Sequence, residues 1–130
     1  MAEARKKILL VDDDKFLVDM YTVKFREASF DIIPAFSGEE AMDRLKEGLD
    51  PDAVILDLIM PGMSGFDFLS AVRQNKLAGR AAFIVLSNQG QHSDIEEAKK
   101  LGIDGYIVKA NTIPSEVLEQ VVEILKKKQK

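Results

Sequence analysis

Side chains that could do chemistry stand directly after four of the five short apolar runs in this chain. They are Asp12 and Asp13, Asp57, Ser87, and Lys109. The runs are apolar at almost every position, which is typical of parallel strands buried on both faces. The carboxyl ends of parallel strands meet at one edge of a sheet, and open α/β sheets bind ligands there. We therefore expect these five groups to converge on one small patch.

Three carboxylates, a hydroxyl and an ammonium are suited to phosphoryl transfer. Clustered carboxylates repel one another and need a cation, and oxygen ligands without His or Cys favour Mg²⁺. Lys109 and Ser87 would contact phosphoryl oxygens that the metal does not reach. One carboxylate must be the nucleophile that forms an aspartyl phosphate. Asp57 is the best choice, because it stands alone after the central run and is flanked by the other groups.

Five strands and five helices are predicted to position these groups. The expected strands are Ile8–Val11, Ile32–Ala35, Ala53–Asp57, Ala82–Leu86 and Gly105–Val108. The expected helices are Lys15–Glu27, Ser37 to Gly48, about Gly65 to Asn75, Ser93 through Leu101, and Pro114 to the terminal lysines. Strand and helix alternate five times, which predicts a doubly wound α/β fold with helices on both faces of a parallel sheet.

Local signals support several of these boundaries. Asp14 is expected to cap the first helix. Ser37 and Ser93 each precede a Glu by three residues, which is the pattern of a capping box. Pro34 suits an edge strand, because proline cannot donate to a hydrogen-bonded ladder on both sides.

Two helices are expected to bury a regular apolar stripe. In the first, Phe16, Met20 and Val23 share one face at helical spacing. In the last, the expected inner stripe is longer. It comprises Val117, Leu118, Val121, Val122 and Leu125.

Composition limits the function classes. The chain has 130 residues, no cysteine and a net charge of −4. One domain fits this length, disulfides are excluded, and the acidic balance disfavours direct nucleic-acid binding. No apolar run approaches the roughly 20 residues of a membrane span, and Ile8–Val11 is too short for a signal peptide. We expect a soluble, cytoplasmic protein without a membrane partner.

Four segments of the chain resemble the receiver domain of two-component response regulators. They are Leu9–Asp13, Asp57 with Met60–Gly65, Leu86–Ser87, and Tyr106–Lys109. The resemblance covers essentially the full length and implies a flavodoxin-like receiver fold, with strands in the order 2-1-3-4-5.

The resemblance also implies residue roles. Asp57 would be the phosphoacceptor. Asp12 and Asp13 would serve Mg²⁺, together with Asp57 and the backbone carbonyl of Ile59. The remaining implied roles are phosphoryl contacts and switching. Ser87 and Lys109 would contact the phosphoryl group. Tyr106 would turn inward when Ser87 moves toward the phosphoryl group.

Two positions depart from the family pattern. Ala110 follows Lys109 where the family usually has proline, often after a cis bond, and a cis bond without proline costs about 3–4 kcal/mol. Either the loop is built differently, or surrounding contacts hold the strain. Asn88 is larger and more polar than the small residue common at its position. It could narrow access to Asp57 or hydrogen-bond an anion or water.

The expected function is that of a single-domain receiver over residues 1–130. Asp57 would accept a phosphoryl group from a histidine kinase or phosphotransfer protein, with only self-phosphorylation and self-dephosphorylation as activity. Because the chain stops after the fifth helix, output is expected through protein contacts or through relay of the phosphoryl group onward. The expected output face comprises Ser93–Leu101, Gly105–Val108 and Pro114–Lys128. The protein would be a monomer or a phosphorylation-dependent dimer.

Two alternatives stay open. A receiver fold could act as a binding module without phosphorylation. A small phosphatase of the haloacid-dehalogenase kind would use Asp12 as nucleophile and Asp14 as acid/base. Phe16 stands where that motif expects Thr or Val, and there is no room for a cap over the substrate. A P-loop protein is disfavoured, because the chain lacks the Gly-rich loop ending in Gly-Lys-Ser/Thr.

Overall fold

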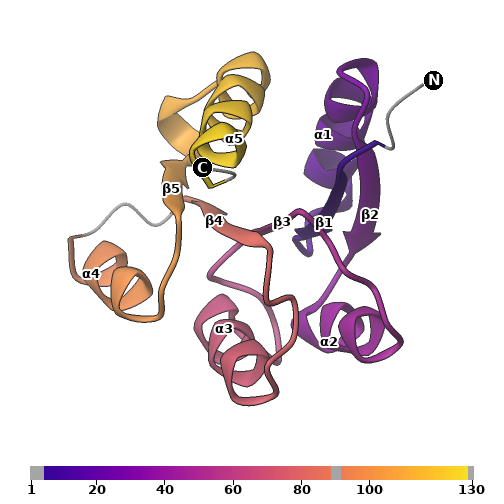
Figure 1. The fold of residues 1–130 in the computed structure, drawn as a ribbon. Coiled ribbons are helices and arrows are strands. Elements are labelled where there is room, and N and C mark those ends of the chain that lie inside the picture. The colour runs from indigo at the N-terminus through magenta and orange to yellow at the C-terminus, as the bar shows by residue number, and fades with distance from the viewer. Residues whose placement is uncertain (1–4, 89–91, 129–130) are drawn as a thin grey trace.

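A computed structural model describes residues 5–88 and 92–128, apart from the side chains of residues 92 and 111. Its strands form one parallel sheet in the order β2-β1-β3-β4-β5, which confirms the predicted order (Figure 1). The strands are β1 (Lys7–Val11), β2 (Asp31–Ala35), β3 (Ala53–Leu56), β4 (Ala82–Ser87) and β5 (Gly105–Val108). All lie within one residue of the predicted ranges.

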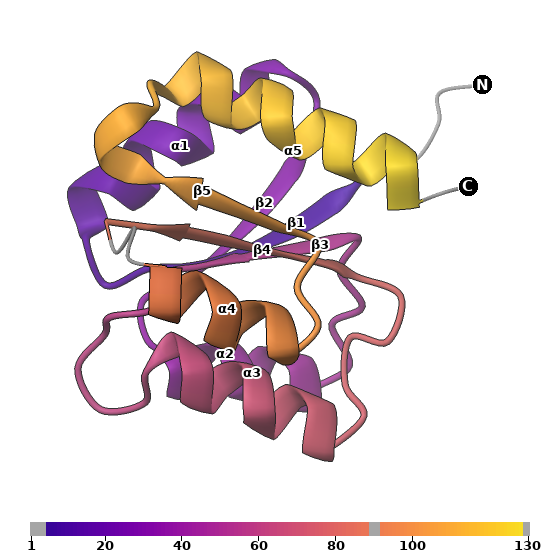
Figure 2. The same cartoon turned by 90° about the vertical axis from the view of Figure 1, so that its left-hand side faces the viewer.

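The helices cover both faces of the sheet. They are α1 (Lys15–Glu27), α2 (Gly38–Lys46), α3 (Gly65–Gln74), α4 (His92–Lys100) and α5 (Pro114–Lys128), with a short 3₁₀ turn, η1, at Lys109–Asn111. Helices α1 and α5 lie on one face, and α2, α3 and α4 lie on the other (Figure 2). No helix in the described part combines the length and apolar character that crossing a membrane requires.

Each face of the sheet has its own apolar core, because successive strand residues point to opposite faces. In β1, Leu9 packs with the α2–α4 layer, whereas Ile8 packs with the α1–α5 layer. In β3, Val54 and Ile55 divide in the same way. The uninterrupted apolar runs of the sequence therefore supply two cores at once.

The apolar face expected for α1 is wrong at two of its three residues, whereas the third, Met20, is partly buried against the core. Phe16 is 76% exposed and Val23 is 61% exposed. The helix instead buries Val18, Tyr21 and Phe25 against the sheet and α5. Both sets repeat at helical spacing, so periodicity alone could not decide which one faces inward.

The last helix differs from its predicted stripe in a related way. Val117, Val121 and Leu125 are buried, as expected. Leu118 and Val122 are only partly buried, on the flank of that stripe. The apolar surface of α5 is therefore wider than its buried contact.

Helix starts agree with the expected caps in two of three cases. Asp14 accepts a hydrogen bond from the Leu17 amide, and Ser37 accepts one from the Glu40 amide. The second bond of the expected capping box differs, because the Glu40 side chain accepts from the Phe36 amide. Ser93 does not open its helix, because α4 already includes His92, and residues 89–91 before it lie outside the described part. A capping box at Ser64, with Asp67 as partner, was not expected.

The edge position of β2 explains its proline. The Asp31 amide donates to the Lys6 carbonyl, and the Ala35 carbonyl accepts from the Asp12 amide. Odd-numbered residues of β2 therefore turn their polar groups toward β1. The nitrogen of Pro34 faces the open edge, where the missing N–H removes no bond between β1 and β2.

Candidate functional site

All the predicted site residues except Tyr106 line one pocket at the carboxyl edge of the sheet. The pocket has a volume of about 320 Å³. Its lining consists of Asp12, Asp13, Asp14, Leu17, Asp57, Ile59, Ser87, Asn88 and Lys109. All five groups chosen from the sequence as candidates for chemistry are therefore brought together. Leu17 was not expected, although its place one turn after the acidic loop could have indicated it.

Two of the carboxylates are fixed by the sheet itself. The Asp57 amide donates to the Val11 carbonyl at 3.0 Å, and the Asp12 amide donates to the Ala35 carbonyl at 3.1 Å. Each bond continues the parallel ladder one residue beyond the strand. The backbone at both aspartates therefore has the rigidity of the central sheet.

The carboxylates form a group that could hold a cation. Oxygens of Asp12, Asp13 and Asp57 all lie within 4.8 Å of one another. Asp12 is 3% exposed and Asp57 is 9% exposed, whereas Asp13 is open to solvent. A cluster of carboxylate oxygens that is buried on one side and open on the other fits Mg²⁺, which keeps several of its waters.

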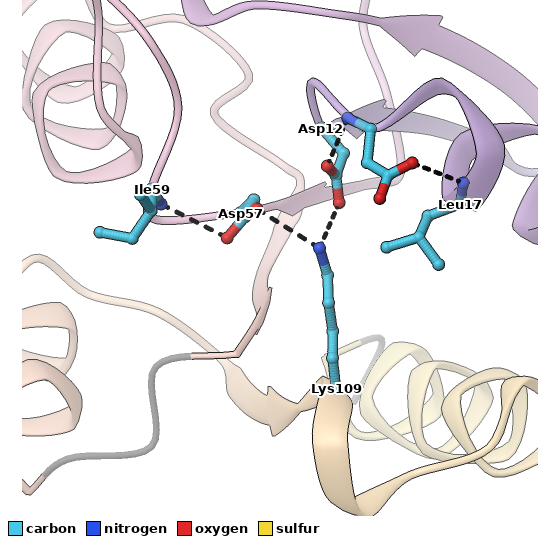
Figure 3. Close-up of polar contacts among 6 residues, drawn as sticks. Asp12, Leu17, Asp57, Ile59 and Lys109 are labelled. Carbon is cyan, nitrogen blue, oxygen red and sulfur yellow. Dashed lines mark hydrogen bonds and ion pairs between the residues drawn. The ribbon is translucent and has the colours of Figure 1, made fainter.

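Lys109, which follows β5, extends its side chain toward Asp12 and Asp57 (Figure 3). Its Nζ lies 2.6 Å from Oδ2 of Asp12 and 3.3 Å from Oδ2 of Asp57. Burial by itself lowers the pKa of the lysine, but the bond with Asp12 and the charge of Asp57 outweigh it and raise the pKa. Lys109 is therefore a fixed positive charge between two carboxylates.

The two buried carboxylates are oriented by short local bonds. Oδ1 of Asp12 accepts the Asp14 amide at 3.0 Å, and Oδ1 of Asp57 accepts the Ile59 amide at 3.3 Å. Burial raises the pKa of Asp12, and the bond from Lys109 opposes this without cancelling it. In both residues the second oxygen, Oδ2, faces Lys109.

The loop after Asp57 requires glycine where α3 begins. A Cβ on Gly65 would overlap the Asp57 carbonyl oxygen and would lie 2.7 Å from the Leu58 Cα. Both are backbone atoms and cannot turn aside. The absence of a side chain at Gly65 therefore lets α3 start directly against the residue that carries the central carboxylate.

The loop after Lys109 is built differently from the cis-proline form. No cis peptide bond occurs among the described residues, and Lys109–Asn111 forms a 3₁₀ turn. The Thr112 amide donates to the Lys109 carbonyl at 3.2 Å, and its hydroxyl donates to the Val108 carbonyl at 2.9 Å. Of the two possibilities left open at Ala110, the structure shows the first.

Ser87 and Tyr106 occupy different positions relative to the pocket. Ser87 ends β4, is fully buried and lines the pocket. Tyr106 lies on β5, is half-buried and packs against the core on the α2–α4 side, outside the pocket lining. Burial raises the pKa of Tyr106, and the negative charges of Asp94 and Asp57 raise it further. The phenol therefore stays neutral within electrostatic range of Asp57.

Fold and pocket together define a doubly wound α/β domain with an acidic, lysine-containing site at the carboxyl edge of its sheet. The response regulator receiver domain family matches this chain over residues 8–123, and the chain belongs to that family. It is therefore a signalling domain of the type found in two-component systems.

Two curated proteins and one solved structure illustrate the similarity. The chain is 32% identical over 122 residues to the alkaline phosphatase synthesis transcriptional regulatory protein PhoP of Bacillus subtilis, covering 94% of this chain and 49% of that protein. It is 34% identical over 109 residues to the DNA-binding response regulator MtrA of Mycobacterium tuberculosis, covering 84% and 46%. The chain thus spans about half the length of these relatives. The structure of the chemotaxis protein CheY4 of Vibrio cholerae superposes with a TM-score of 0.85 at 27% identity, covering 93% of this chain and 99% of that one.

Proposed function

We propose that this domain accepts a phosphoryl group on Asp57 and changes its affinity for a protein partner as a result. The observation that carries the proposal is the arrangement of Lys109 between Asp12 and Asp57, with Asp13 completing the carboxylate group. It gives a nucleophile, a set of cation ligands and a fixed positive charge in one pocket. The proposed product is an acyl phosphate on Asp57.

Each group has a role that its position supports. Asp12, Asp13, Asp57 and the backbone carbonyl of Ile59 would hold Mg²⁺, which when bound offsets negative charge on the phosphoryl oxygens. Lys109 would move from its apo bond with Asp12 toward a phosphoryl oxygen. Ser87 would donate its hydroxyl to another oxygen. Catalysis of this kind depends mainly on positioning and charge.

The proposed donor is a histidine kinase or a phosphotransfer protein. A donor protein must bring its phosphoryl group to Asp57 across the rim of the pocket. Ile59 lines the pocket and is 58% exposed, and Phe16, which precedes the lining residue Leu17 in the chain, is 76% exposed. They give a protein donor apolar surface to rest on while the charged centre stays open.

The proposed output surface is formed by α4, β5 and α5. Tyr106 lies on it, and Ser87 pairs with Val108 of β5, so a movement of Ser87 reaches this surface through adjacent strands. The partner would be a protein surface, either on a separate protein or on a further domain. A single receiver unit over residues 1–130 and a cytoplasmic location also stay predictions.

Incubation with acetyl phosphate and Mg²⁺, followed by intact-mass measurement, tests the proposal. The wild-type chain should gain one phosphoryl group, Asp57→Asn should gain none, and Asp43→Asn, an exposed carboxylate on α2, should behave as wild type. An adduct that survives in Asp57→Asn but is lost in Asp12→Asn would instead support the phosphatase alternative. Partner binding that is unchanged in Asp57→Ala would support the binding-module alternative.

A further inference from the structure

A groove on the α1–α5 face lies away from the acidic site. It has a volume of about 610 Å³, and Ala28 and Phe30, where α1 leads into β2, line one part of it. One wall consists of Leu118 and Val122 of α5, which are four residues apart on the same helix face. These are the two stripe residues that α5 leaves only partly buried. The groove is therefore an apolar surface that no described part of the chain covers.

Charge is distributed unevenly along the exposed side of α5. Glu119 and Glu123 line the groove near the middle of the helix. The last turn carries Lys126, Lys127 and Lys128. Lys126 lies 4.0 Å from Glu123, and both side chains are about two-thirds exposed, at 69% and 65%. One helix thus presents an acidic segment and a basic segment beside the same apolar groove.

This pattern complements itself when two copies of the helix run antiparallel. A two-fold axis near Val122 and Glu123 would place Val122 of each copy against the groove of the other. It would also place Glu119 of each copy opposite Lys126 of the second. An isologous contact uses every pair twice, so a single complementary pair counts double.

We propose that two copies of this chain associate through the α1–α5 face, with their α5 helices antiparallel across the groove described above. Self-complementary charge favours a second copy over an unrelated partner. The contact uses no residue of the acidic pocket. It also uses the flank of α5 opposite Ile124, the side chain that packs over Gly105 of β5. The contact therefore does not require phosphorylation, and it leaves open the part of the output surface formed by α4, β5 and the Ile124 flank of α5.

Sedimentation equilibrium over a concentration series reaching about 1 mM tests the proposal. The wild-type chain should show a monomer–dimer equilibrium without phosphorylation. Glu119→Lys and Lys126→Glu should each weaken dimerisation about tenfold, since each reversal replaces two attractions with two repulsions. The combined reversal, Glu119→Lys with Lys126→Glu, should restore it to within about threefold of wild type. Glu47→Lys, an exposed reversal on the segment after α2, is the matched control and should change nothing.

Exposed charge reversals leave the core intact, so loss of folding does not confuse the result. A monomer throughout the series would overturn the proposal. So would single reversals without effect, or a combined reversal that stays as weak as the singles. A dimer seen only with a beryllofluoride mimic bound would also overturn it, because the groove contains none of the residues that such a mimic would touch.

Discussion

The Nζ atom of Lys109 lies 2.6 Å from Oδ2 of Asp12, closer than the 3.3 Å that separates it from Oδ2 of Asp57. In the unphosphorylated chain the lysine is therefore held mainly by the first strand and only secondarily by the third. Phosphoryl transfer to Asp57 would draw the lysine toward the new charge. The bond with Asp12 is thus the interaction that the proposed reaction must weaken.

Replacing Lys109 should affect stability and chemistry together. Lys109→Met leaves two buried carboxylates without their cation, which should reduce the free energy of unfolding by about 1–3 kcal/mol without Mg²⁺. Added Mg²⁺ should recover more stability in this variant than in wild type, because the ion takes over the missing positive charge. Urea unfolding with and without Mg²⁺ measures both effects.

A matched control for that variant is Lys128→Met. Lys128 Nζ lies 3.3 Å from Asp104 in an ion pair whose lysine is 41% exposed. An exposed pair contributes about 0–1 kcal/mol, so this variant should unfold almost as wild type and show no additional response to Mg²⁺. If added Mg²⁺ stabilised the two variants equally, Lys109 would not compete with Mg²⁺ for the carboxylates of Asp12 and Asp57.

Gly65→Ala should be strongly destabilising. Its Cβ would overlap the Asp57 carbonyl oxygen, and neither backbone can move without shifting α3 or the end of β3. We expect a loss of about 2–4 kcal/mol and slower phosphorylation at Asp57. Gly79→Ala, whose Cβ would meet nothing within 4 Å, should change stability by less than about 1 kcal/mol. Thermal unfolding of the two variants side by side makes the comparison.

The corrected face of α1 can be tested with two phenylalanines of the same helix. Phe25 is 1% exposed and its ring centroid lies 5.8 Å from that of Phe30, so Phe25→Ala should lose about 3–5 kcal/mol. Phe16 is 76% exposed, so Phe16→Ala should stay within about 0.5 kcal/mol of wild type. Chemical denaturation of both variants measures these losses. If the sequence-based stripe were correct, Phe16→Ala would lose more stability than Phe25→Ala.

Asp52 should contribute to acid sensitivity. Its carboxylate accepts the Lys7 amide at 2.7 Å and an Arg80 nitrogen at 2.5 Å. Burial alone raises the pKa of Asp52, but these two bonds outweigh it and lower the pKa. A carboxyl group whose pKa is lower in the folded than in the unfolded chain stabilises the fold at pH values above its unfolded pKa, about 3.9. This stabilisation is lost as the pH falls through the folded pKa.

Asp52→Asn should therefore be less stable than wild type by about 1 kcal/mol near neutral pH, with the difference shrinking in acid. Urea unfolding at several pH values measures this trend. Asp50→Asn is the control, because Asp50 binds the same arginine but its side chain is 64% exposed. A stability difference that grows as pH falls would mean that the folded chain does not lower the pKa of Asp52.

The parts of the fold that could be predicted are those whose sequence pattern is compatible with only one arrangement. Strands buried on both faces must be apolar throughout, so their ends were clear, and the parallel sheet brings Asp12, Asp57 and Lys109 together. The orientation of α1 had two solutions, since the sets containing Phe16 and Phe25 are both apolar and both helical in period. Only the packing of α1 against the sheet and α5 decides between them.

Finer features of the site depended on contacts that a sequence does not display. The preference of Lys109 for Asp12 over Asp57 is a matter of tenths of an ångström. The 3₁₀ turn after Lys109 follows from hydrogen bonds of Thr112, a residue that carried no signal in the motif. The close approach at Gly65 belongs to a recognisable motif, but the atoms that require glycine there become visible only in three dimensions.

The proline of β2 bears on how copies of this chain can meet. An open strand edge usually offers unpaired N–H groups to any passing strand and so invites aggregation. Here Pro34 removes an N–H donor from that edge, and the charged Asp31 is the first residue of the strand. Uncontrolled growth through strand addition is thereby discouraged at this margin of the sheet. The proposed two-fold contact between α5 helices, by contrast, closes after two copies instead of propagating.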